Sequence, residues 1–301
     1  MLLAGILVIV ALVVTDGAHG HSKSATTAGK ASAHRKHPAV AKAPVDPLTT
    51  TDAKNWVASR SGQVSAAVEN LKTGQEWLLD PNARDQTASI IKADILETLL
   101  YQAEQSGQPI TSVETSVPQG MIEASDNDDA TSLWDTINGA SGISQYNTLA
   151  GLTQTTPNTQ GFWGETLTSA ADQIKILRQL AQPSKLLTPA AQAYQLGLME
   201  NVDLDENWGV SGGVPQGVTV ALKNGWVPLT SNTDWEVNSI GWIKGDSRDY
   251  LLAVLTDNDP SEQYGINTIN KFAADVYANL GPAGTKPLSI TYGSATNTRQ
   301  P

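Results

Sequence analysis

The sequence predicts an α+β fold in which one five-stranded antiparallel sheet is covered by terminal helices on one face and by a helical lobe on the other. Two strand-like runs lie near the start of the chain and three lie near its end, and helical segments lie between and outside them. Strands that are grouped apart from helices are typical of α+β folds rather than of parallel α/β folds. The sequence shows no internal repeat, and its one glycine-rich stretch, residues 209–217, lacks the strand and helix of a nucleotide-binding loop.

The N-terminal part of the chain has the pattern of a leader followed by a spacer. Residues 1–20 begin with an apolar run shorter than the roughly 20 residues of a membrane span, and the small residues Ala18 and Gly20 follow it. This pattern indicates an export signal, and an uncleaved membrane anchor is the alternative because a basic N-terminal region is missing. Residues 21–46 are rich in Ala, Ser, Lys and Pro and are expected to form a flexible basic linker. We therefore expect an exported protein, extracellular or in the cell envelope, with association to membrane or wall through residues 1–46.

The folded domain is expected over residues 47–281, and residues 282–301 are expected to form a tail. Thr and Asp residues that suit a helix N-cap open the first helix, and the turn at residues 72–74 joins two strands of a hairpin. Ile266, Ile269 and Phe272 share one face of the last helix, which makes that helix amphipathic. The elements expected in order are helix 46–60, strands 63–71 and 75–80, helix 88–103, helices 171–181 and 188–202 within a middle region of short helices, strands 218–223, 235–243 and 249–257, and helix 265–280.

The helix expected at residues 88–103 carries a serine and a lysine where apolar residues would be expected. At about 100° per residue, Ser89 and Lys92 fall within the apolar sector. A lysine in a core costs several kcal/mol unless it is paired or loses its proton, and the alternative is a side chain that extends out to water. The opposite side of the helix, which is expected to face water, consists of Asp94, Glu97, Thr98 and Tyr101.

Composition excludes several kinds of chemistry. The chain has no cysteine, and its four histidines all lie between residues 19 and 37. A Ser-His-Asp triad, a thiol nucleophile and a zinc site of histidine or cysteine are therefore excluded from the folded domain, and no cofactor or metal is expected. The net charge of −11 argues against nucleic-acid binding. If the domain is a hydrolase, its base must be lysine, a carboxylate or tyrosine.

Three short motifs occur in order along the folded domain. Ser89 precedes Lys92 by three residues, and this is the one serine and lysine pair with that spacing in the sequence. The second motif is residues 125–127, Ser-Asp-Asn, and the third is residues 223–225, Lys-Asn-Gly. A second Lys-x-Gly stretch, residues 72–74, lies before Ser89 and is better explained as a hairpin turn. Each motif alone is weak, but the ordered set is specific.

With this set of motifs the chain resembles the active-site-serine β-lactamases and penicillin-binding proteins, and among them the class A β-lactamases most closely. The resemblance covers roughly residues 47–281. It implies a β-lactamase/transpeptidase-like fold and a β-lactam or a peptidoglycan stem peptide as the substrate. The implied catalytic residues are Ser89, Lys92, Ser125 and Lys223. The implied substrate-binding residues are Asn127, Asn224, Gly225 and Trp226, with the backbone N–H groups of Ser89 and Trp226 as the oxyanion hole.

The sequence departs from the family at two places. Asn224 stands where the family has Thr or Ser, and the loop before residue 170 lacks the family's glutamate that activates the deacylating water. Glu165 is the one acidic residue of that loop, and it is expected either to sit at the start of the next helix or, less favoured, to support deacylation. Trp226, Trp235 and Trp242 flank the last strands and serve either core packing or an aromatic rim.

Three functions follow from these observations. The first is an exported β-lactamase-like serine hydrolase that deacylates slowly. The second is a peptidoglycan DD-peptidase or penicillin-binding protein. The third is a non-catalytic envelope binding module that keeps the fold.

Overall fold

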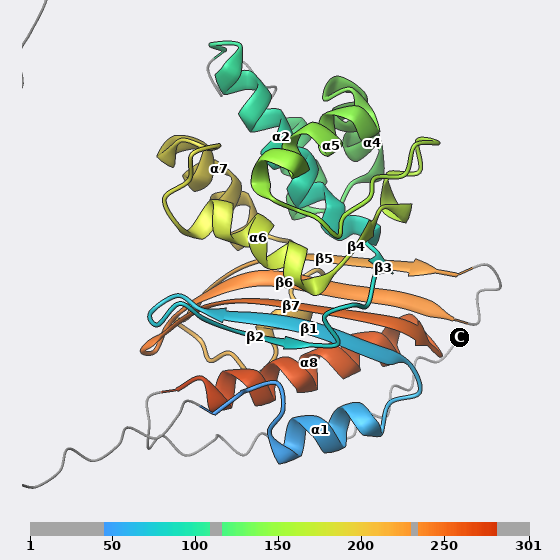
Figure 1. Cartoon of the computed structure of the whole chain (residues 1–301), viewed down its shortest axis with the longest axis vertical. Helices are drawn as coiled ribbons and strands as arrows, with labels where there is room; N and C mark the ends of the chain where they lie inside the picture. The colour runs from blue at the N-terminus through green and yellow to red at the C-terminus, as the bar shows by residue number, and fades with distance from the viewer. Residues whose placement is uncertain (1–44, 109–115, 230–233, 282–301) are drawn as a thin grey trace, which may run out of the picture. The chain divides into compact units, whose positions relative to one another are not determined.

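The computed structural model describes residues 45–108, 116–229 and 234–281, and a five-stranded antiparallel sheet is the centre of this part of the chain (Figure 1). The predicted leader at residues 1–20, most of the linker at residues 21–46 and the tail at residues 282–301 lie outside the described residues. The strand order is β2-β1-β7-β6-β5. The bounds are β1 Gln63–Asn70, β2 Gln75–Leu79, β5 Thr219–Pro228, β6 Trp235–Gly245 and β7 Arg248–Asp259.

Strand pairing joins the two ends of the domain. β1 and β2 form the N-terminal hairpin, and β1 pairs antiparallel with β7, where Ala67 lies opposite Ala253. β7 and β5 then flank β6, so β5 forms one edge of the sheet. The single five-stranded sheet expected from the sequence is therefore confirmed.

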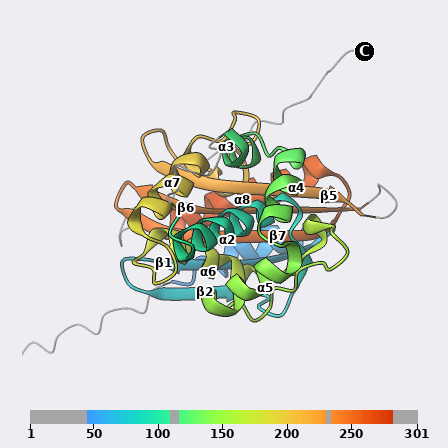
Figure 2. The ribbon, with the colours of Figure 1, turned by 90° about the horizontal axis from the view of Figure 1, so that it is seen from above.

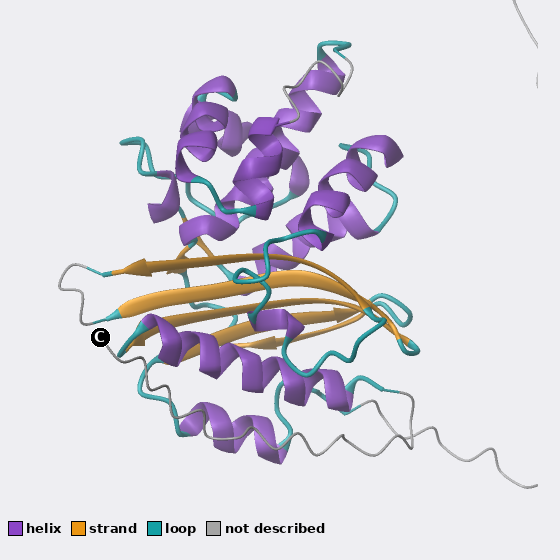
Figure 3. Ribbon diagram, turned by 180° about the vertical axis from the view of Figure 1, so that it is seen from behind, coloured by secondary structure: helices purple, strands orange, loops and turns teal. Residues whose placement is uncertain are grey.

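The two terminal helices cover one face of this sheet. They are α1, Thr51–Ala58, and α8, Glu262–Asn279, and Figure 3 shows them stacked beneath the strands. Trp56 of α1 donates from Nε1 to the carbonyl of Thr268 in α8 at 3.0 Å. The core of this layer contains Val68 and Val254 from the sheet and Phe272 from α8. Side chains alternate between the two faces along a strand. The residues next to Val68 and Val254 in the sequence therefore face the helical lobe on the other side of the sheet.

A helical lobe covers the other face. Figure 2 shows α2 in the middle of this lobe with the other helices around it. The α-helices of the lobe are α2 Ile91–Gln105, α3 Ser116–Glu123, α4 Asn127–Thr136, α5 Gly139–Ala150, α6 Ala170–Ala181 and α7 Pro189–Glu200. Three single-turn 3₁₀ helices occur in the described part of the chain, and they are η1 Ala88–Ile90, η3 Trp163–Glu165 and η4 Gly209–Ser211. A small two-stranded sheet of β3, Asp85–Gln86, and β4, Leu167–Thr168, was not expected from the sequence.

The expectation that the polar side of α2 faces water was wrong. Asp94, Glu97 and Thr98 are at most 1% exposed, and only Tyr101 is partly exposed. The reason is that α3, α4, α5 and α7 pack against α2 and cover its first ten residues, 91–100, on all sides. Tyr146 of α5 donates its hydroxyl to Glu97 Oε2 at 2.7 Å. Burial raises the pKa of Asp94 to about 7, as expected for a carboxyl in a low-dielectric site.

The third motif also lies differently from the expectation. β5 continues to Pro228 instead of ending at Lys223, so residues 223–225 lie inside the strand. Among the helices described here, none is both long enough and apolar enough to span a bilayer.

Candidate active site

The turn that carries Ser89 joins β3 to α2 through η1. Ala88 adopts a φ of +45°, a left-handed conformation that costs an alanine about 1–2 kcal/mol. Backbone strain of this kind is found at functional sites, where the surrounding structure holds it in place. Here Thr87 N donates to Thr166 O at 2.8 Å, and Asn238 of β6 donates from Nδ2 to the carbonyls of Gln86 and Thr87 at 2.8 and 3.2 Å.

The edge strand β5 approaches this turn closely. A Cβ placed on Gly225 would lie 2.5 Å from Ser89 N and 2.7 Å from Ile90 N. Distances this short are not tolerated between a side chain and a backbone, so glycine is required where the two segments meet. The structure thus brings Gly225 of the third motif to the backbone of Ser89.

Lys92 lies one turn after Ser89 and is fully buried. Its Nζ donates to Ser125 O at 2.6 Å, to Ser125 Oγ at 3.2 Å and to Asn127 Oδ1 at 2.8 Å. Of the two alternatives for this lysine, the buried one is therefore correct. Burial, and next the charge of Lys223, lower the pKa of Lys92 to about 7.

The hydroxyl of Ser125 lies between two lysines. Lys223 of β5 donates from Nζ to Ser125 Oγ at 2.9 Å and to the carbonyl oxygen of Asn224 at 3.2 Å. Burial lowers the pKa of Lys223 to about 8. Ser125 has a φ of +56° and directly precedes α4, whose N-cap is Asp126. The structure therefore joins the second and third motifs to Lys92 through this one hydroxyl.

Ser89 and Lys92 are neighbours without a direct hydrogen bond. Within the described part of the chain, Lys92 Nζ has only Ser125 and Asn127 as hydrogen-bond partners, and Ser89 Oγ has no partner. Hydrogen bonds of this kind are often long without substrate and tighten in the substrate complex. Ser89 lines a pocket, which is where an acyl group would have to bind.

The pocket beside Ser89 has a volume of about 430 Å³. Thr131 and Trp163 form part of its wall, and Trp163 Nε1 donates to Thr131 Oγ1 at 3.3 Å. Lys92 Nζ lies 5.0 Å from the centre of the Trp163 ring. The residues lining the pocket are Ala88, Ser89, Asn127, Thr131, Gly161, Phe162, Trp163, Gly164, Glu165, Trp226 and Val227.

Asn224 does not reach this pocket, which corrects its assignment as a substrate-binding residue. Its side chain is fully buried and donates from Nδ2 to the carbonyls of Glu206 and Trp208 at 2.6 and 3.1 Å. The physical reason is the alternation of side chains along β5. Lys223 and Gly225 share the face toward Ser89, and Asn224 lies on the opposite face.

Glu165 is not the start of a helix, which corrects the favoured expectation for this residue. Helix α6 begins at Ala170 and is capped by Ser169, whose side chain accepts from Asp172 N. Glu165 lies in η3, is exposed and lines the pocket together with Ser89. Its Oε2 accepts from Asn158 Nδ2 at 3.1 Å.

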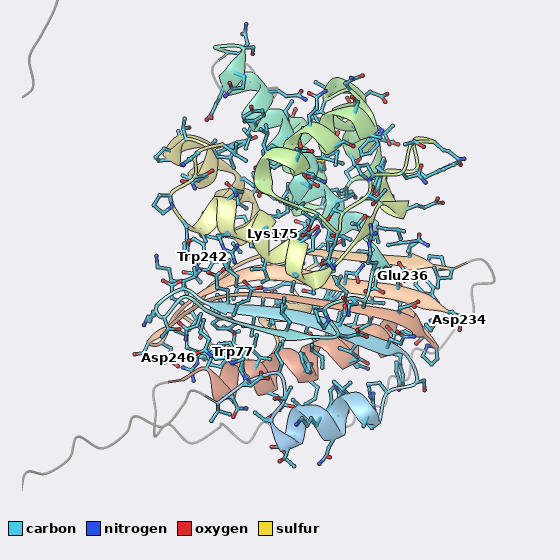
Figure 4. All side chains as sticks on the ribbon, in the orientation of Figure 1. Trp77, Lys175, Asp234, Glu236, Trp242 and Asp246 are labelled. Atoms are coloured by element: carbon cyan, nitrogen blue, oxygen red, sulfur yellow. The ribbon has the colours of Figure 1, made fainter. Side chains whose placement is uncertain are left out.

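The three tryptophans of the last strands have different surroundings. Trp226 lines the pocket and also packs against the core on the α8 side, and its ring is tilted by 59° to that of Trp208, with ring centres 5.9 Å apart. Trp235 packs against the core on the α8 side. Trp242 donates to Asp249 at 2.7 Å and lies toward the other end of the sheet from Glu236, as Figure 4 shows.

Sequence reasoning missed three residues of the site. Asn238 holds the Ser89 turn, Trp163 lies over Lys92, and Glu206 is buried near Lys223, whose pKa its charge raises. The one available signal was an asparagine, Asn238, in the middle of a strand that is buried on both sides of it. Over the described ranges, no group of three or more acidic or histidine side chains is placed to hold a metal ion.

The fold is that of class A β-lactamases and of a penicillin-binding protein. The TLA-1 extended-spectrum β-lactamase matches with a TM-score of 0.68 at 13% identity, over 75% of this chain and 96% of that protein. PBP-A matches with a TM-score of 0.66 at 19% identity, over 78% of this chain and 97% of that protein.

The family itself is shown by the sequence. The model of the beta-lactamase enzyme family matches residues 115–280, and the chain belongs to that family. LppW of Mycobacterium tuberculosis, provisionally named as a lipoprotein, is 25% identical over 244 residues, which cover 77% of this chain and 75% of LppW.

Proposed function

We propose that this protein is a serine hydrolase that forms an acyl-enzyme at Ser89 with β-lactams or D-alanyl peptides and that deacylates slowly. The observation that carries the proposal is the buried chain of polar groups from Lys92 through Ser125 to Lys223 beside a serine that opens onto a pocket. Serine becomes nucleophilic when a neighbouring base removes its proton. In a domain without histidine, a buried lysine is the group suited to that task.

The geometry supports a balanced sequence of proton transfers. Ser89 Oγ attacks the carbonyl carbon of the substrate while its proton passes to the neutral amine of Lys92. The carbon–nitrogen bond then breaks, and the leaving nitrogen takes the proton of the Ser125 hydroxyl. The Lys92 ammonium, 3.2 Å from Ser125 Oγ, restores that proton. Lys223 holds the same hydroxyl from the other side at 2.9 Å.

The developing negative charge on the carbonyl oxygen needs backbone donors. We propose the N–H groups of Ser89 and Trp226, because β5 is an edge strand and Gly225 lies against the backbone of Ser89. Ser89 is also at the N-terminal end of the α2 region, where the helix dipole favours negative charge. Asn127 and Trp226 line the pocket and are proposed to contact the substrate.

The proposed place of action is the cell envelope or its exterior. The support is the leader-like pattern of residues 1–20, the basic linker at residues 21–46 and the provisional lipoprotein name of LppW. Residues 47–281 are proposed to be the whole hydrolase domain, followed by a tail at residues 282–301.

The test is covalent labelling by a fluorescent penicillin, followed by intact mass over several hours. We expect one adduct on the wild-type protein and none on Ser89→Ala. An adduct that persists indicates a penicillin-binding protein or a slow β-lactamase, and one that decays within minutes indicates an efficient β-lactamase. The absence of any adduct at millimolar penicillin would contradict the proposal and favour a non-catalytic binding module.

Acylation is expected to speed up as the pH rises through about 7. Lys92 accepts a proton only in its neutral form, and burial lowers the pKa of Lys92 to about 7. Below that pH the labelling rate should fall about tenfold per pH unit, because the neutral fraction falls in that proportion. The check is the rate of Ser89 adduct formation between pH 5.5 and 8. A rate that stays flat over this range would exclude Lys92 as the base.

Glu165→Gln is expected to slow the loss of the adduct by about a hundredfold, the lower end of a general-base contribution. Glu165 is the carboxylate that lines the pocket with Ser89, so it is proposed to position or deprotonate the deacylating water. Glu200→Gln is the matched control, because Glu200 lines a separate surface pocket. Equal adduct lifetimes in wild type and Glu165→Gln would show that deacylation does not use this residue.

A further inference from the structure

One aromatic side chain covers the amine of Lys92. The centre of the Trp163 ring lies 5.0 Å from Lys92 Nζ. Trp163 lines the Ser89 pocket, whereas Lys92 is fully buried and is not among the described residues that line this pocket. The indole ring therefore separates the amine from the space in which a substrate and an attacking water would lie.

The indole ring is held in this position from two sides. Its Nε1 donates to Thr131 Oγ1 of α4 at 3.3 Å, and the same hydroxyl donates to the carbonyl oxygen of Asn127 at 2.9 Å. The backbone of η3 is joined to the η1 turn, because Thr87 Oγ1 donates to the carbonyl oxygen of Gly164 at 3.3 Å. Both the helix α4 and the η1 turn belong to the site, so the ring is fixed relative to the reacting groups.

The gap between the ring and the amine is too small for a water molecule. A water that is hydrogen-bonded to the amine at about 2.9 Å and touches the ring face at about 3.5 Å needs more room than the 5.0 Å between Lys92 Nζ and the ring centre. The acceptors that the amine does have, on Ser125 and Asn127, are protein atoms. The ring therefore keeps water from the amine on the side of the pocket.

Lys92 is the base that water would use if it reached this place. In the proposed acylation the amine takes the proton of Ser89 and gives it back through Ser125, so the amine is neutral again in the acyl-enzyme. Burial lowers the pKa of Lys92 to about 7, and a neutral amine beside the ester is a suitable general base. The charged groups that act on this amine are Lys223 of β5, Glu206, and Asp126 and Asp129 at the start of α4.

From these contacts we infer that Trp163 prolongs the life of the acyl-enzyme by keeping water away from Lys92. The inference rests on the proposed acyl-enzyme function and deepens it, because it names the residue that sets how fast the adduct is hydrolysed. Glu165 is exposed and lines the pocket, so the slow hydrolysis that remains in the wild type is assigned to this carboxylate.

Removal of the ring opens a second route of hydrolysis. A water occupies about 30 Å³ and needs two to four polar partners, and the amine of Lys92 and the oxygen atoms around it supply them. The water oxygen attacks the carbonyl carbon of the ester while its proton passes to the neutral amine. The bond from that carbon to Ser89 Oγ then breaks, and Oγ takes the proton back from the Lys92 ammonium.

The experiment measures the lifetime of the penicillin adduct in variants of Trp163. Each protein is labelled to completion with a fluorescent penicillin, the excess is removed, and the intact mass is followed over time. Trp163→Ala and Trp163→Ser are expected to lose the adduct about a hundredfold faster than the wild type, the lower end of a general-base contribution. Trp163→Phe keeps an aromatic ring over the amine and should lose the adduct at nearly the wild-type rate.

Two comparisons separate this effect from a loosened loop. In Trp163→Ala/Glu165→Gln the adduct should be lost as fast as in Trp163→Ala, because the second route uses Lys92 and not the carboxylate. The acylation rate of Trp163→Ala should change far less than its rate of adduct loss, because Ser89 and Lys92 are both kept. A structural role alone would change the two rates together.

Trp242→Ala is the matched control. Like Trp163, Trp242 donates from Nε1 to a side chain, that of Asp249 at 2.7 Å, and its ring centre lies 4.8 Å from a lysine nitrogen, Lys244 Nζ. Trp242 is not among the described residues that line the Ser89 pocket. Its removal should therefore leave the acylation rate and the adduct lifetime at their wild-type values.

Each contrary result has a distinct meaning. Adduct loss at the wild-type rate in Trp163→Ala and Trp163→Ser overturns the inference and leaves acylation at Ser89 standing, and so does a wild-type adduct that decays within minutes. A gain in Trp163→Ala that disappears with Glu165→Gln assigns the new route to Glu165 and overturns the role of Lys92. Folded Trp163 variants that no longer form the adduct show that the ring serves acylation instead, which also overturns the inference. If the wild type forms no adduct, the inference falls together with the proposed function.

Discussion

Lys92→Ala is expected to lower the rate of acylation at pH 8 by about 10³-fold, within the range of a lost general base. The variant keeps Ser89, the pocket and the strand β5, but it lacks the amine that is proposed to take the Ser89 proton. The fold should survive, because the lost side chain is a buried amine whose burial disfavours its charged form. The acceptors on Ser125 and Asn127 lose their donor, so the free energy of unfolding should fall by about 1–3 kcal/mol.

The control for this variant is Lys72→Ala. Lys72 begins the other Lys-x-Gly stretch and donates to Ser247 O on an exposed turn, so its removal should leave the labelling rate unchanged. Penicillin labelling followed by intact mass gives both rates, and thermal unfolding gives both stabilities. Labelling of Lys92→Ala at the wild-type rate, with an unchanged unfolding temperature, would show that Ser89 has another base.

Much of the fold could be predicted because the pattern of apolar residues is local. The residues of β1, β6 and β7 form either alternating or continuous apolar segments. Few arrangements can pair these segments into one sheet, so the sheet itself was predictable. The polar side of α2 could not be predicted in the same way. An amphipathic pattern assumes one solvent face, and here the lobe surrounds the helix and pairs Glu97 with Tyr146.

The sequence predicted which motifs meet at the candidate site, but it did not predict the direction of every side chain in them. Ser89, Lys92, Ser125 and Lys223 were expected to meet, and the hydrogen bonds at Ser125 Oγ join both lysines to it. The direction of Asn224 depends on how far β5 continues, because extension of the strand through residues 223–225 fixes which side chains share a face. Glu165 lies outside α6 because Ser169, four residues later, is the N-cap of that helix. Several Ser and Thr residues of this segment are suitable N-caps, so the sequence alone did not show which of them begins the helix.

The second large effect is expected for Gly225→Ala. The added Cβ would lie 2.5 Å from Ser89 N, 2.7 Å from Ile90 N and 2.8 Å from Thr87 O. All three atoms belong to the backbone, so no side chain can rotate away to make room. The turn and β5 must therefore separate. We expect a loss of about 1–3 kcal/mol in the free energy of unfolding, as for other overpacked sites.

The same separation should affect acylation more than stability. Ser89 N and Trp226 N are the proposed oxyanion donors, and they lie on the two segments that the new methyl group pushes apart. A displacement of about 1 Å can cost a reaction about 10²-fold, so the labelling rate of folded Gly225→Ala should fall at least that far.

Gly197→Ala is the control, because its Cβ meets nothing within 4 Å and lies in helix α7. Alanine there should stabilise by up to about 1 kcal/mol and leave labelling unchanged. If Gly225→Ala labels and unfolds like the wild type, β5 does not lie against the backbone of Ser89, and the proposed oxyanion hole must be abandoned.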